Sequence, residues 1–343
     1  MSRICLITDT HMGIRGNSPY FLENQKKFFE EVFFPYLDDN PDIKTVVHLG
    51  DVFDKRPTVN FVILDEAIKC LFNPLKERGL TTHVIIGNHD TPFRNSNSLN
   101  APQLLLTLGY DFNVYSGPTE VEIEGNKLCF VPWINDENRT ESIDLIEKTE
   151  SKYLLGHLEI SGFQMQKGVT QKEGLSRSIF DKFTYTLSGH FHHRSTEGRI
   201  YYLGSPYEMT WADFENKKGF HILDFDTNNL EFIENPNTVF EYVDEFDNIK
   251  EETLAGKMVK INLTSFTSEE IEKTYSAIDK FKIRPQNILF INNKFVQSNT
   301  AIVDTKGEIQ TTPKLIETYV KSINGDDTLT KYVTGIYEKA LQL

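Results

Sequence analysis

Residues 3–11 read Arg-Ile-Cys-Leu-Ile-Thr-Asp-Thr-His, a strand-like apolar run that ends on a carboxylate and an imidazole two positions apart. Four further strand-like runs also lead into short polar motifs. In chain order the five motifs are Asp9-Thr10-His11, Gly50-Asp51-Val52-Phe53-Asp54, Gly87-Asn88-His89-Asp90, Gly156-His157 and Gly189-His190-Phe191-His192. In α/β sheets, binding sites form outside the carboxyl ends of the strands. The repetition therefore predicts an α/β fold with one site built from five strand ends.

Strand-like and helix-like segments alternate over the first two-thirds of the chain. The strand-like runs are Arg3–Thr8, Lys44–Leu49, Thr81–Ile86, Lys127–Pro132, Lys152–Leu155, Thr184–Ser188, Ile200–Leu203, Gly219–Phe225, Leu230–Ile233 and Thr238–Val243. Amphipathic helical stretches lie at Glu23–Leu37 and Asn60–Arg78, where apolar residues recur at helical spacing. Because the later strands come closer together, we expect a two-sheet β-sandwich flanked by helices.

The composition changes near residue 244, where an acidic stretch begins and a compact strand–helix–strand pattern follows. Thr267 followed by glutamates marks the expected helix start in this small α+β unit. We expect a first domain, this small domain, a polar linker and two C-terminal helices with apolar stripes. Their respective ranges are 1–243, 244–293, 294–312 and 313–343. The C-terminal helices either pack on their own domain or bind a partner.

Composition limits the class of protein further. At 343 residues the chain is long enough for one large domain and a smaller one. The three cysteines, Cys5, Cys70 and Cys129, are scattered, which favours buried, reduced thiols in a cytosolic protein over disulfides or a zinc site. Because residues 3–8 already read as a strand, we expect no signal peptide, and no apolar stretch of the sequence is long enough for a bilayer.

The formal net charge of −14 argues, taken alone, against nucleic acid as a partner. Bound divalent ions would weaken that argument, because they add positive charge where a phosphate must sit. The acidity also hints that a partner supplies part of any DNA-binding surface.

The five motifs supply carboxylates, an amide and imidazoles, with no thiolate among them. Asp9 and His11 alternate on one strand end and can reach a single ion, while Asp51 can bridge two ions, one oxygen to each. The remaining expected ligands are Asn88, His157, His190 and His192. This nitrogen and oxygen set favours Mn²⁺, Fe or Zn²⁺ over Ca²⁺ or structural zinc. Two such ions about 3.5–4 Å apart serve phosphate-ester hydrolysis.

His89 is not needed as a ligand, so we expect it to act as a general acid or as a donor to the leaving oxygen. Asp90 is expected to hold its other ring nitrogen and fix its orientation. Three roles stay open for Asp54: a carboxylate that contacts a metal ligand, a solvated loop carboxylate, or a cap. Histidines inside apolar strands are more simply explained as structural residues, and these are His48, His83 and His221.

The motifs follow the pattern Asp-x-His, Gly-Asp, Gly-Asn-His-Asp/Glu, Gly-His and Gly-His-x-His, so residues 3–235 resemble the calcineurin-like metallophosphoesterases. Within them the sequence looks most like the SbcD-type nucleases, which process DNA double-strand breaks with an SMC-like ATPase, SbcC. The features that carry this closer resemblance are Lys55-Arg56-Pro57 after the Asp51 motif, Val131-Pro132-Trp133-Ile134 and Gly189-His190-Phe191-His192. The unit after residue 250 resembles a DNA-capping domain, and the compact size is similar to phage-encoded members.

The resemblance implies an Mn²⁺-dependent nuclease that degrades duplex ends and cuts single strands. One ion would be bound by Asp9, His11, Asp51 and His192. The other would be bound by Asp51, Asn88, His157 and His190. His89 would be the catalytic histidine. Candidate contacts to the phosphate backbone, or else merely solvated side chains, are Lys55, Arg56 and Arg94.

The resemblance also implies partners: DNA, an SbcC-like ABC-type ATPase bound through the C-terminal helices, and a second copy of the chain in the cytoplasm. The apolar faces of Glu23–Leu37 and Phe61–Leu75 either meet across a two-fold axis or bury within the domain. Two alternatives stay open. One is a general phosphoesterase acting on nucleotides or phosphoproteins, and the other is a non-catalytic scaffold for an ATPase or a DNA end.

Overall fold

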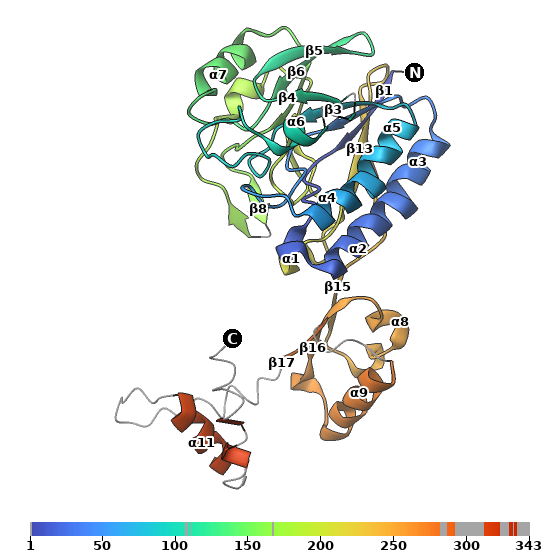
Figure 1. Cartoon of the computed structure of the whole chain (residues 1–343), viewed down its shortest axis with the longest axis vertical. Coiled ribbons are helices and arrows are strands. Elements are labelled where there is room, and N and C mark those ends of the chain that lie inside the picture. The colour runs from blue at the N-terminus through green and yellow to red at the C-terminus, as the bar shows by residue number, and fades with distance from the viewer. Residues whose placement is uncertain are drawn as a thin grey trace.

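The computed structural model describes residues 2–106, 109–110, 112–166, 168–281, 287–291, 312–322, 329–331 and 333–334. Two six-stranded β-sheets pack face to face in the larger unit, with helices on their outer sides (Figure 1). This arrangement confirms the expected helix-flanked sandwich. In the part of the chain described, no helix has the length and apolar character needed to cross a membrane.

The first sheet has the order β14-β13-β1-β2-β3-β4, and the second has the order β11-β12-β10-β7-β6-β5. The strands of the first are β1 (Arg3–Ile7), β2 (Thr45–His48), β3 (Thr81–Ile85), β4 (Phe112–Tyr115), β13 (Gly219–Asp224) and β14 (Asn229–Glu234). Those of the second are β5 (Thr119–Ile123), β6 (Asn126–Val131), β7 (Tyr153–His157), β10 (Tyr185–Gly189), β11 (Ser195–Glu197) and β12 (Ile200–Tyr202). Strands β1 to β4 run parallel, and so do β6, β7, β10 and β12.

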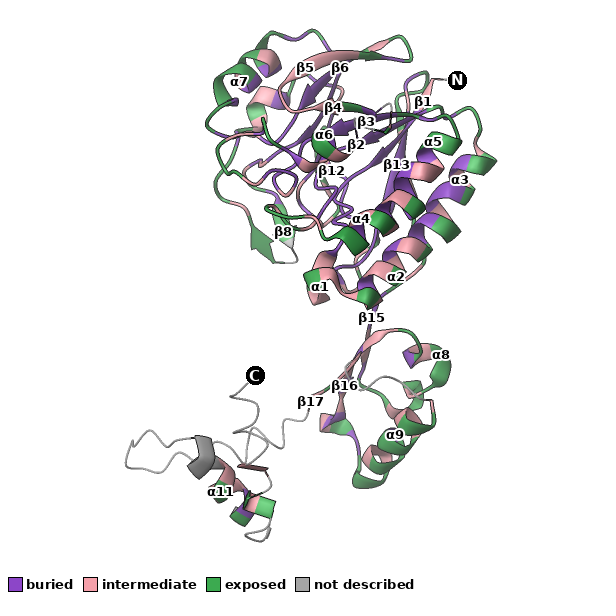
Figure 2. Cartoon of the chain, viewed as in Figure 1, coloured by how far each residue is buried: buried purple, intermediate pink, exposed green. Residues whose placement is uncertain are grey.

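Strand β1 shows why the sandwich forms. Its side chains alternate between two apolar environments, because successive residues of a strand point to opposite faces. Ile4 and Leu6 pack between the two sheets, whereas Cys5 and Ile7 pack under the outer helices. A strand that is covered on both faces reads as a continuous apolar run, and Figure 2 shows this burial along the strands of both sheets. All three cysteines are buried and unbonded, as expected.

Two long helices cover the first sheet, and each contains one wider, π-helical turn. The first consists of α2 (Pro19–Phe28), the turn Phe29–Phe33 and α3 (Phe34–Asp39). The second consists of α4 (Phe61–Ala67), the turn Ile68–Phe72 and α5 (Asn73–Glu77). Each wide turn lies just before a proline, Pro35 or Pro74. Since proline lacks an N–H and its ring crowds the carbonyl four residues back, the wider turn lets the helix continue.

The remaining helices of the larger unit are short. They are α1 (Ile14–Asn17), α6 (Ala101–Leu106) and α7 (Arg139–Lys148), and a small hairpin is formed by β8 (Gln164–Gln166) and β9 (Val169–Thr170). No segment expected from the sequence corresponds to β4, β5, β8, β9, β11, α1, α6 or α7.

The small unit is built on a parallel sheet of β15 (Phe240–Val243), β16 (Met258–Asn262) and β17 (Ile288–Ile291). Helix α9 (Ser268–Lys280) connects β16 to β17, and α8 (Glu251–Leu254) lies between β15 and β16. At the start of α9, the Thr267 hydroxyl accepts from the Glu270 N–H, and the Glu270 carboxylate accepts from the Thr267 N–H, which caps the helix. The expected strand–helix–strand layout is therefore present.

Strand β15 corrects the expected boundary at residue 243. It pairs with β16 rather than with β14 of the larger unit, so the small unit begins no later than Phe240, before the expected residue 244. Most of the expected linker 294–312 and most of the second C-terminal helix lie outside the described residues. Helix α11 (Thr312–Ser322) matches the first expected C-terminal helix.

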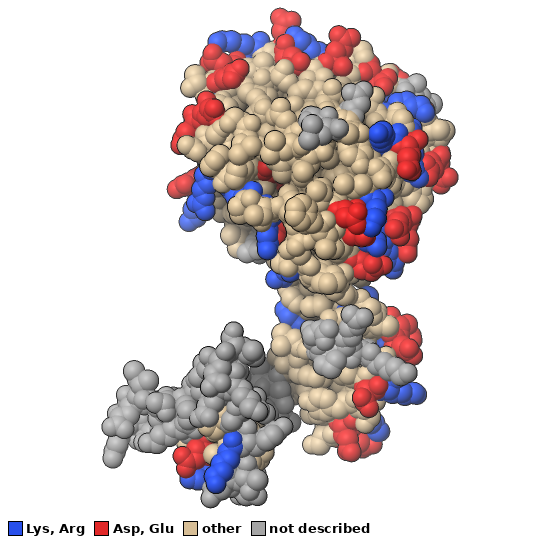
Figure 3. Space-filling view, viewed as in Figure 1, with Lys and Arg blue, Asp and Glu red and all other residues tan. Residues whose placement is uncertain are grey.

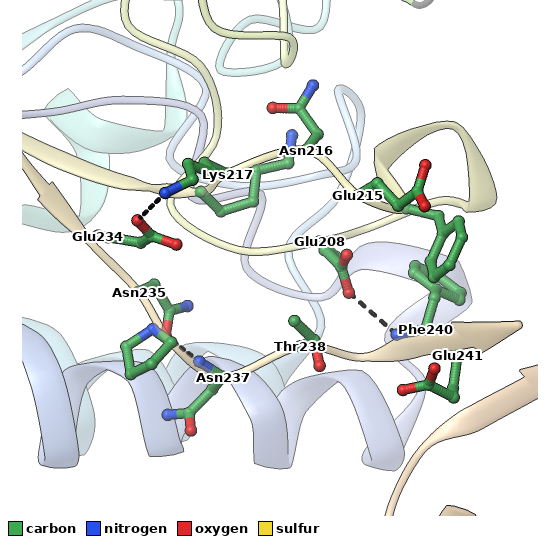
Figure 4. Close-up of a pocket in the computed structure, with 13 residues that line it drawn as sticks. Glu208, Glu215, Asn216, Lys217, Glu234, Asn235, Asn237, Thr238, Phe240 and Glu241 are labelled. Carbon is green, nitrogen blue, oxygen red and sulfur yellow. Dashed lines mark hydrogen bonds and ion pairs between the residues drawn. The ribbon is translucent and has the colours of Figure 1, made fainter. Parts of the chain in front are cut away.

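The two units are joined by a buried carboxylate. Glu208 accepts hydrogen bonds from the N–H groups of Val239 (2.6 Å) and Phe240 (2.9 Å), where the small unit begins. Figure 4 shows this contact at the wall of a cavity of about 400 Å³. Phe240 also packs with Phe21 and Val239 beside Trp211. Apolar packing and two charge-assisted hydrogen bonds therefore fix the first residues of β15.

His221 of β13 makes the stability of the fold depend on pH. Its side chain is buried against Phe232, and its Nδ1 finds no hydrogen-bond partner among the described residues. Burial, together with the charge of Arg194, lowers the pKa of His221 to about 3. An unfolded histidine binds a proton below pH of about 6.5, so stability is lost as pH falls from there towards 3.

We predict that His221→Leu stabilises the protein at pH 5 relative to the unchanged chain, by about 2 kcal/mol more than at pH 8. The reason is that the unfolded variant can no longer gain a proton at this position. Chemical denaturation of both proteins at the two pH values, with a chelator present, measures the difference. An equal change in unfolding free energy at pH 5 and pH 8 would contradict the prediction.

Candidate metal centre and active site

The five motifs converge at one end of the sandwich. Strands β1, β2 and β3 are parallel neighbours in the first sheet, and β7 and β10 are parallel neighbours in the second. Their carboxyl ends therefore meet across the gap between the sheets. The strand ends are also tied to one another, because the Asp9 N–H donates to Gly50 O and the His11 N–H donates to Asp51 O, each at 3.0 Å.

One half of the site contains Asp9, His11 and His192, whose ligand atoms all lie within 4.8 Å of one another. The Nε2 atoms of His11 and His192 are 3.0 Å apart. An Asp9 oxygen lies 3.8 Å from the first nitrogen and 4.0 Å from the second. Two imidazole nitrogens that face each other beside a buried carboxylate suit a cation between them.

The other half contains Asp51, Asn88, His157 and His190. The Asn88 side-chain oxygen lies 3.0 Å from His157 Nε2 and 2.8 Å from His190 Nδ1. His157 Nδ1 is 2.8 Å from the Leu49 carbonyl and donates to it. This contact fixes the tautomer and leaves Nε2 as the ligand atom.

Asp51 lies between the two halves. Its Oδ2 is 3.5 Å from His11 Nε2 and 3.3 Å from His157 Nε2. Its Oδ1 accepts the backbone N–H of His89 at 2.6 Å. A single oxygen thus faces both halves, and the bridging role expected for Asp51 stays a prediction.

Backbone strain is concentrated at the ligands. Positive φ angles occur at Asp9 (51°), His11 (39°), Asp51 (56°) and His190 (88°). Such conformations cost on the order of 1–3 kcal/mol each and persist only where the surroundings enforce them. At Gly87, a Cβ would lie 2.3 Å from Asp51 Oδ1, so the glycine before Asn88 is required by close approach.

The buried imidazoles differ in their proton affinity. Burial alone would lower the pKa of His11, but the nearby carboxylates of Asp54 and Asp9 raise it to about 10. Burial would also lower the pKa of His157, but the nearby charge of Asp51 raises it to about 9. Burial lowers the pKa of both His190 and His192 to about 4. The carboxylates thus attract positive charge to the site, and a bound cation would displace those protons.

His89 is half-buried, and the centroid of its ring lies 4.8 Å from the centroid of the His11 ring. Its Nδ1 contacts the backbone carbonyl of Asp54 at 2.5 Å, so that carbonyl, and not Asp90, orients the ring. The Asp54 carboxylate stands 3.6 Å from His11 Nδ1, behind the ligands.

Asp90 has a structural contact set. Its carboxylate accepts the backbone N–H groups of Asp51 (2.8 Å), Val52 (2.8 Å) and Gly87 (2.9 Å). The expected Asp90–His89 contact is therefore wrong, because His89 Nδ1 contacts the Asp54 carbonyl while the Asp90 carboxylate accepts backbone N–H groups. Burial and the charge of Asp51 raise the pKa of Asp90 to about 7.

The candidate phosphate contacts lie beside the site. The Arg56 guanidinium stacks over the Trp133 ring at 5.1 Å and is half-buried. Lys55 and Arg94 are exposed. Burial, and then the charge of Arg94, lowers the pKa of Arg56. Their role towards phosphate stays a prediction.

Sequence reasoning missed three residues that support the ligands. Gln25 Nε2 donates to the carbonyls of Thr10 and His11, each at 3.0 Å. The Tyr207 hydroxyl donates to Thr10 O, and Lys218 Nζ donates to His192 O at 2.7 Å. Each is a single polar residue distant in sequence, so no local motif identifies it.

Residues 2–194 match the family described as calcineurin-like phosphoesterase. The chain belongs to this family, and both the expected fold and the expected phosphoester-hydrolase class are confirmed.

Three curated relatives are similar along the chain. Exonuclease subunit 1 of Enterobacteria phage T4 is 27% identical over 356 residues, covering 99% of this chain and 100% of that protein. DNA double-strand break repair protein Mre11 of Methanocaldococcus jannaschii is 27% identical over 247 residues, covering 66% and 63%. The SbcD component of the SbcCD nuclease of Staphylococcus epidermidis is 22% identical over 356 residues, covering 94% and 93%. The expected resemblance to SbcD-type nucleases is confirmed.

We predict that His89→Asn lowers phosphodiester hydrolysis by at least about 10²-fold while metal content stays near that of the unchanged protein. Asparagine cannot carry the catalytic proton, whereas the seven expected ligands stay in place. Metal content after gel filtration and hydrolysis of an aryl phosphodiester are measured together, with Asp51→Asn as the variant expected to lose metal. Loss of metal in His89→Asn would make His89 a ligand and contradict this role.

Proposed function

We propose that the chain is a DNA nuclease that uses two divalent ions, with Mn²⁺ as the activating ion. It would degrade linear duplexes from their ends and cut single-stranded DNA internally. The observation that carries the proposal is the placement of the Asp51 oxygen between two clusters of imidazoles. The names of the relatives, an exonuclease subunit, a break repair protein and a nuclease subunit, support DNA as the substrate.

These distances support the ligand sets that the family resemblance implies. Asp9, His11, Asp51 and His192 would hold one ion. Asp51, Asn88, His157 and His190 would hold the other. When bound, the pair would lower the pKa of water and neutralise charge on the phosphate.

His89 is the proposed proton donor to the leaving oxygen. Its Nδ1–H is engaged by the Asp54 carbonyl at 2.5 Å, so Nε2 is the atom that would carry the transferred proton. His89 is half-buried, so its ring remains accessible to a substrate. Asp90 would support the reaction indirectly, because its hydrogen bonds hold the loop that carries His89 and the loop that carries Asp51.

An acidic chain needs local help to bind DNA. On the face drawn in Figure 3, acidic and basic side chains are interspersed around the rim of the larger unit. We propose that Lys55, Arg56 and Arg94 supply phosphate contacts beside the metals, which position a duplex without reading its sequence. We also propose that the small unit caps the bound DNA, supported by the Glu208 contacts that fix its first strand.

A partner ATPase is proposed for the C-terminal helices. Two of the relatives are named as subunits. In α11, Ile316 and Tyr319 are half-buried and lie three residues apart, as in helices that bind a groove, while Val320 is buried within the chain. An SbcC-like ABC-type ATPase in the cytoplasm is the proposed partner.

A homodimer is proposed through the N-terminal end of α4. The apolar residues of Glu23–Leu37 are used within the chain's own core, so that stretch buries inside the domain. Phe61 is 86% exposed and Leu104 is 55% exposed, beside a cavity of about 290 Å³ that both residues line. A contiguous exposed apolar patch of this kind marks an interaction surface, and a second copy is the proposed occupant.

We predict Mn²⁺-dependent degradation of end-labelled linear duplex DNA that disappears in His89→Asn. The assay includes an aryl phosphodiester and a phosphomonoester, with and without an ATPase partner. Hydrolysis of the small esters without action on DNA would move the function to a general phosphoesterase. Metal binding without hydrolysis of anything would favour the scaffold.

We predict that Phe61→Glu converts a dimer into a monomer, because a charge would be buried in an apolar contact. Light scattering after gel filtration measures the mass, and aryl phosphodiester hydrolysis should be unchanged. Tyr275→Glu places the same charge at an exposed aromatic residue of the small unit and should leave the mass unchanged. If the wild-type protein is monomeric at micromolar concentration, the proposed dimer is contradicted.

A further inference from the structure

Lys218 is a buried cation that no step of the proposed reaction uses. Its side chain is 3% exposed, and that of its partner Asp213 is 7% exposed. We propose that Lys218 is a positioning residue, which fixes the backbone of His192 and so the imidazole that completes one metal site. The inference rests on the proposed metal ligands.

All three ammonium protons of Lys218 have acceptors. Nζ donates to His192 O at 2.7 Å, to Ser205 Oγ at 2.9 Å and to Asp213 Oδ1 at 2.6 Å. A buried ion pair adds little net stability, since desolvation offsets the attraction between the charges. Its effect here is on geometry, because the ion pair holds the Lys218 ammonium group in hydrogen-bond contact with the carbonyl of His192, a proposed metal ligand.

His192 is the ligand that most needs such support. It lies beyond the end of β10, in a loop, and its side chain is 30% exposed. Besides Lys218, its carbonyl accepts the N–H of Ser205 at 3.2 Å. Asp213 is itself held in place, because its other oxygen accepts the N–H groups of Met209 (3.0 Å) and Thr210 (2.8 Å).

The same segment, Gly204–Asp213, also supports the neighbouring ligand. Tyr207 donates to Thr10 O, and Gln25 joins the Tyr207 hydroxyl (3.1 Å) to His11 O (3.0 Å). Both imidazoles of one metal site therefore rest on one buried hydrogen-bond network. Within the described residues, none of these contacts reaches Asn88, His157 or His190, so loss of Lys218 should weaken one ion selectively.

Lys217 provides a matched control. It is the adjacent lysine, and it forms an ion pair with Glu234 at 2.7 Å at the cavity wall, as Figure 4 shows. Its side chain is 64% exposed. Lys217→Met therefore removes a positive charge from the adjacent residue without removing any of the hydrogen bonds that support His11 or His192.

The test is titration of the metal-free full-length protein with Mn²⁺, followed by calorimetry and by the electron paramagnetic resonance signal of a coupled Mn²⁺ pair. In Lys218→Met, one ion should bind about 10–100-fold more weakly, while the other keeps its affinity. The pair signal should then appear only at correspondingly higher Mn²⁺. Lys217→Met should match the unchanged protein.

Lys218→Met leaves the Asp213 charge unpaired and can fail to fold for that reason. The double variant Lys218→Met/Asp213→Asn removes both charges and keeps an oxygen for the N–H groups of Met209 and Thr210, so no buried charge is left unpaired. Wild-type affinity for both ions in the folded single or double variant would overturn the positioning role. If the wild-type protein does not bind two Mn²⁺ ions, that result instead contradicts the proposed metal centre.

Discussion

The geometry of the site depends on the Asp90 carboxylate. It accepts N–H groups from Asp51, Val52 and Gly87, and so ties the loop after β2 to the loop after β3. A carboxylate that accepts several amides is held firmly. Because of this bond set, Asp51 keeps its left-handed backbone (φ 56°) and its Oδ2 faces both clusters. Displacement of Asp90 would therefore alter every ligand contact that involves Asp51.

The sandwich supplies the force that keeps these strained loops in place. Burial of a Val, Leu, Ile or Phe side chain stabilises a fold by about 1.5–3 kcal/mol, and many such residues are fully buried between and outside the sheets. Each strained ligand costs on the order of 1–3 kcal/mol. Since the strands end in register as parallel neighbours, a rigid scaffold holds loops whose conformations would not persist alone.

The sequence allowed the ligand positions to be predicted because each follows an apolar strand, and strand periodicity is a local property. It did not allow the contacts of Asp90 to be predicted, since neighbouring side chains diverge in a turn and the amides come from elsewhere. The strand β15 was recognised, but its partner is set by tertiary pairing. Gln25, Tyr207 and Lys218 carry no local pattern, because their function depends on contact with loops that are remote in the sequence.

Segment Gly204–Asp213 joins two features that the sequence gives no reason to connect. At one position Glu208 holds the N–H groups of Val239 and Phe240, where the small unit begins. At another, Asp213 holds Lys218, which contacts the carbonyl of His192. A continuous run of covalent and hydrogen bonds therefore connects the first residues of β15 with a proposed metal ligand. A rearrangement of the backbone of this segment would therefore alter both sets of contacts.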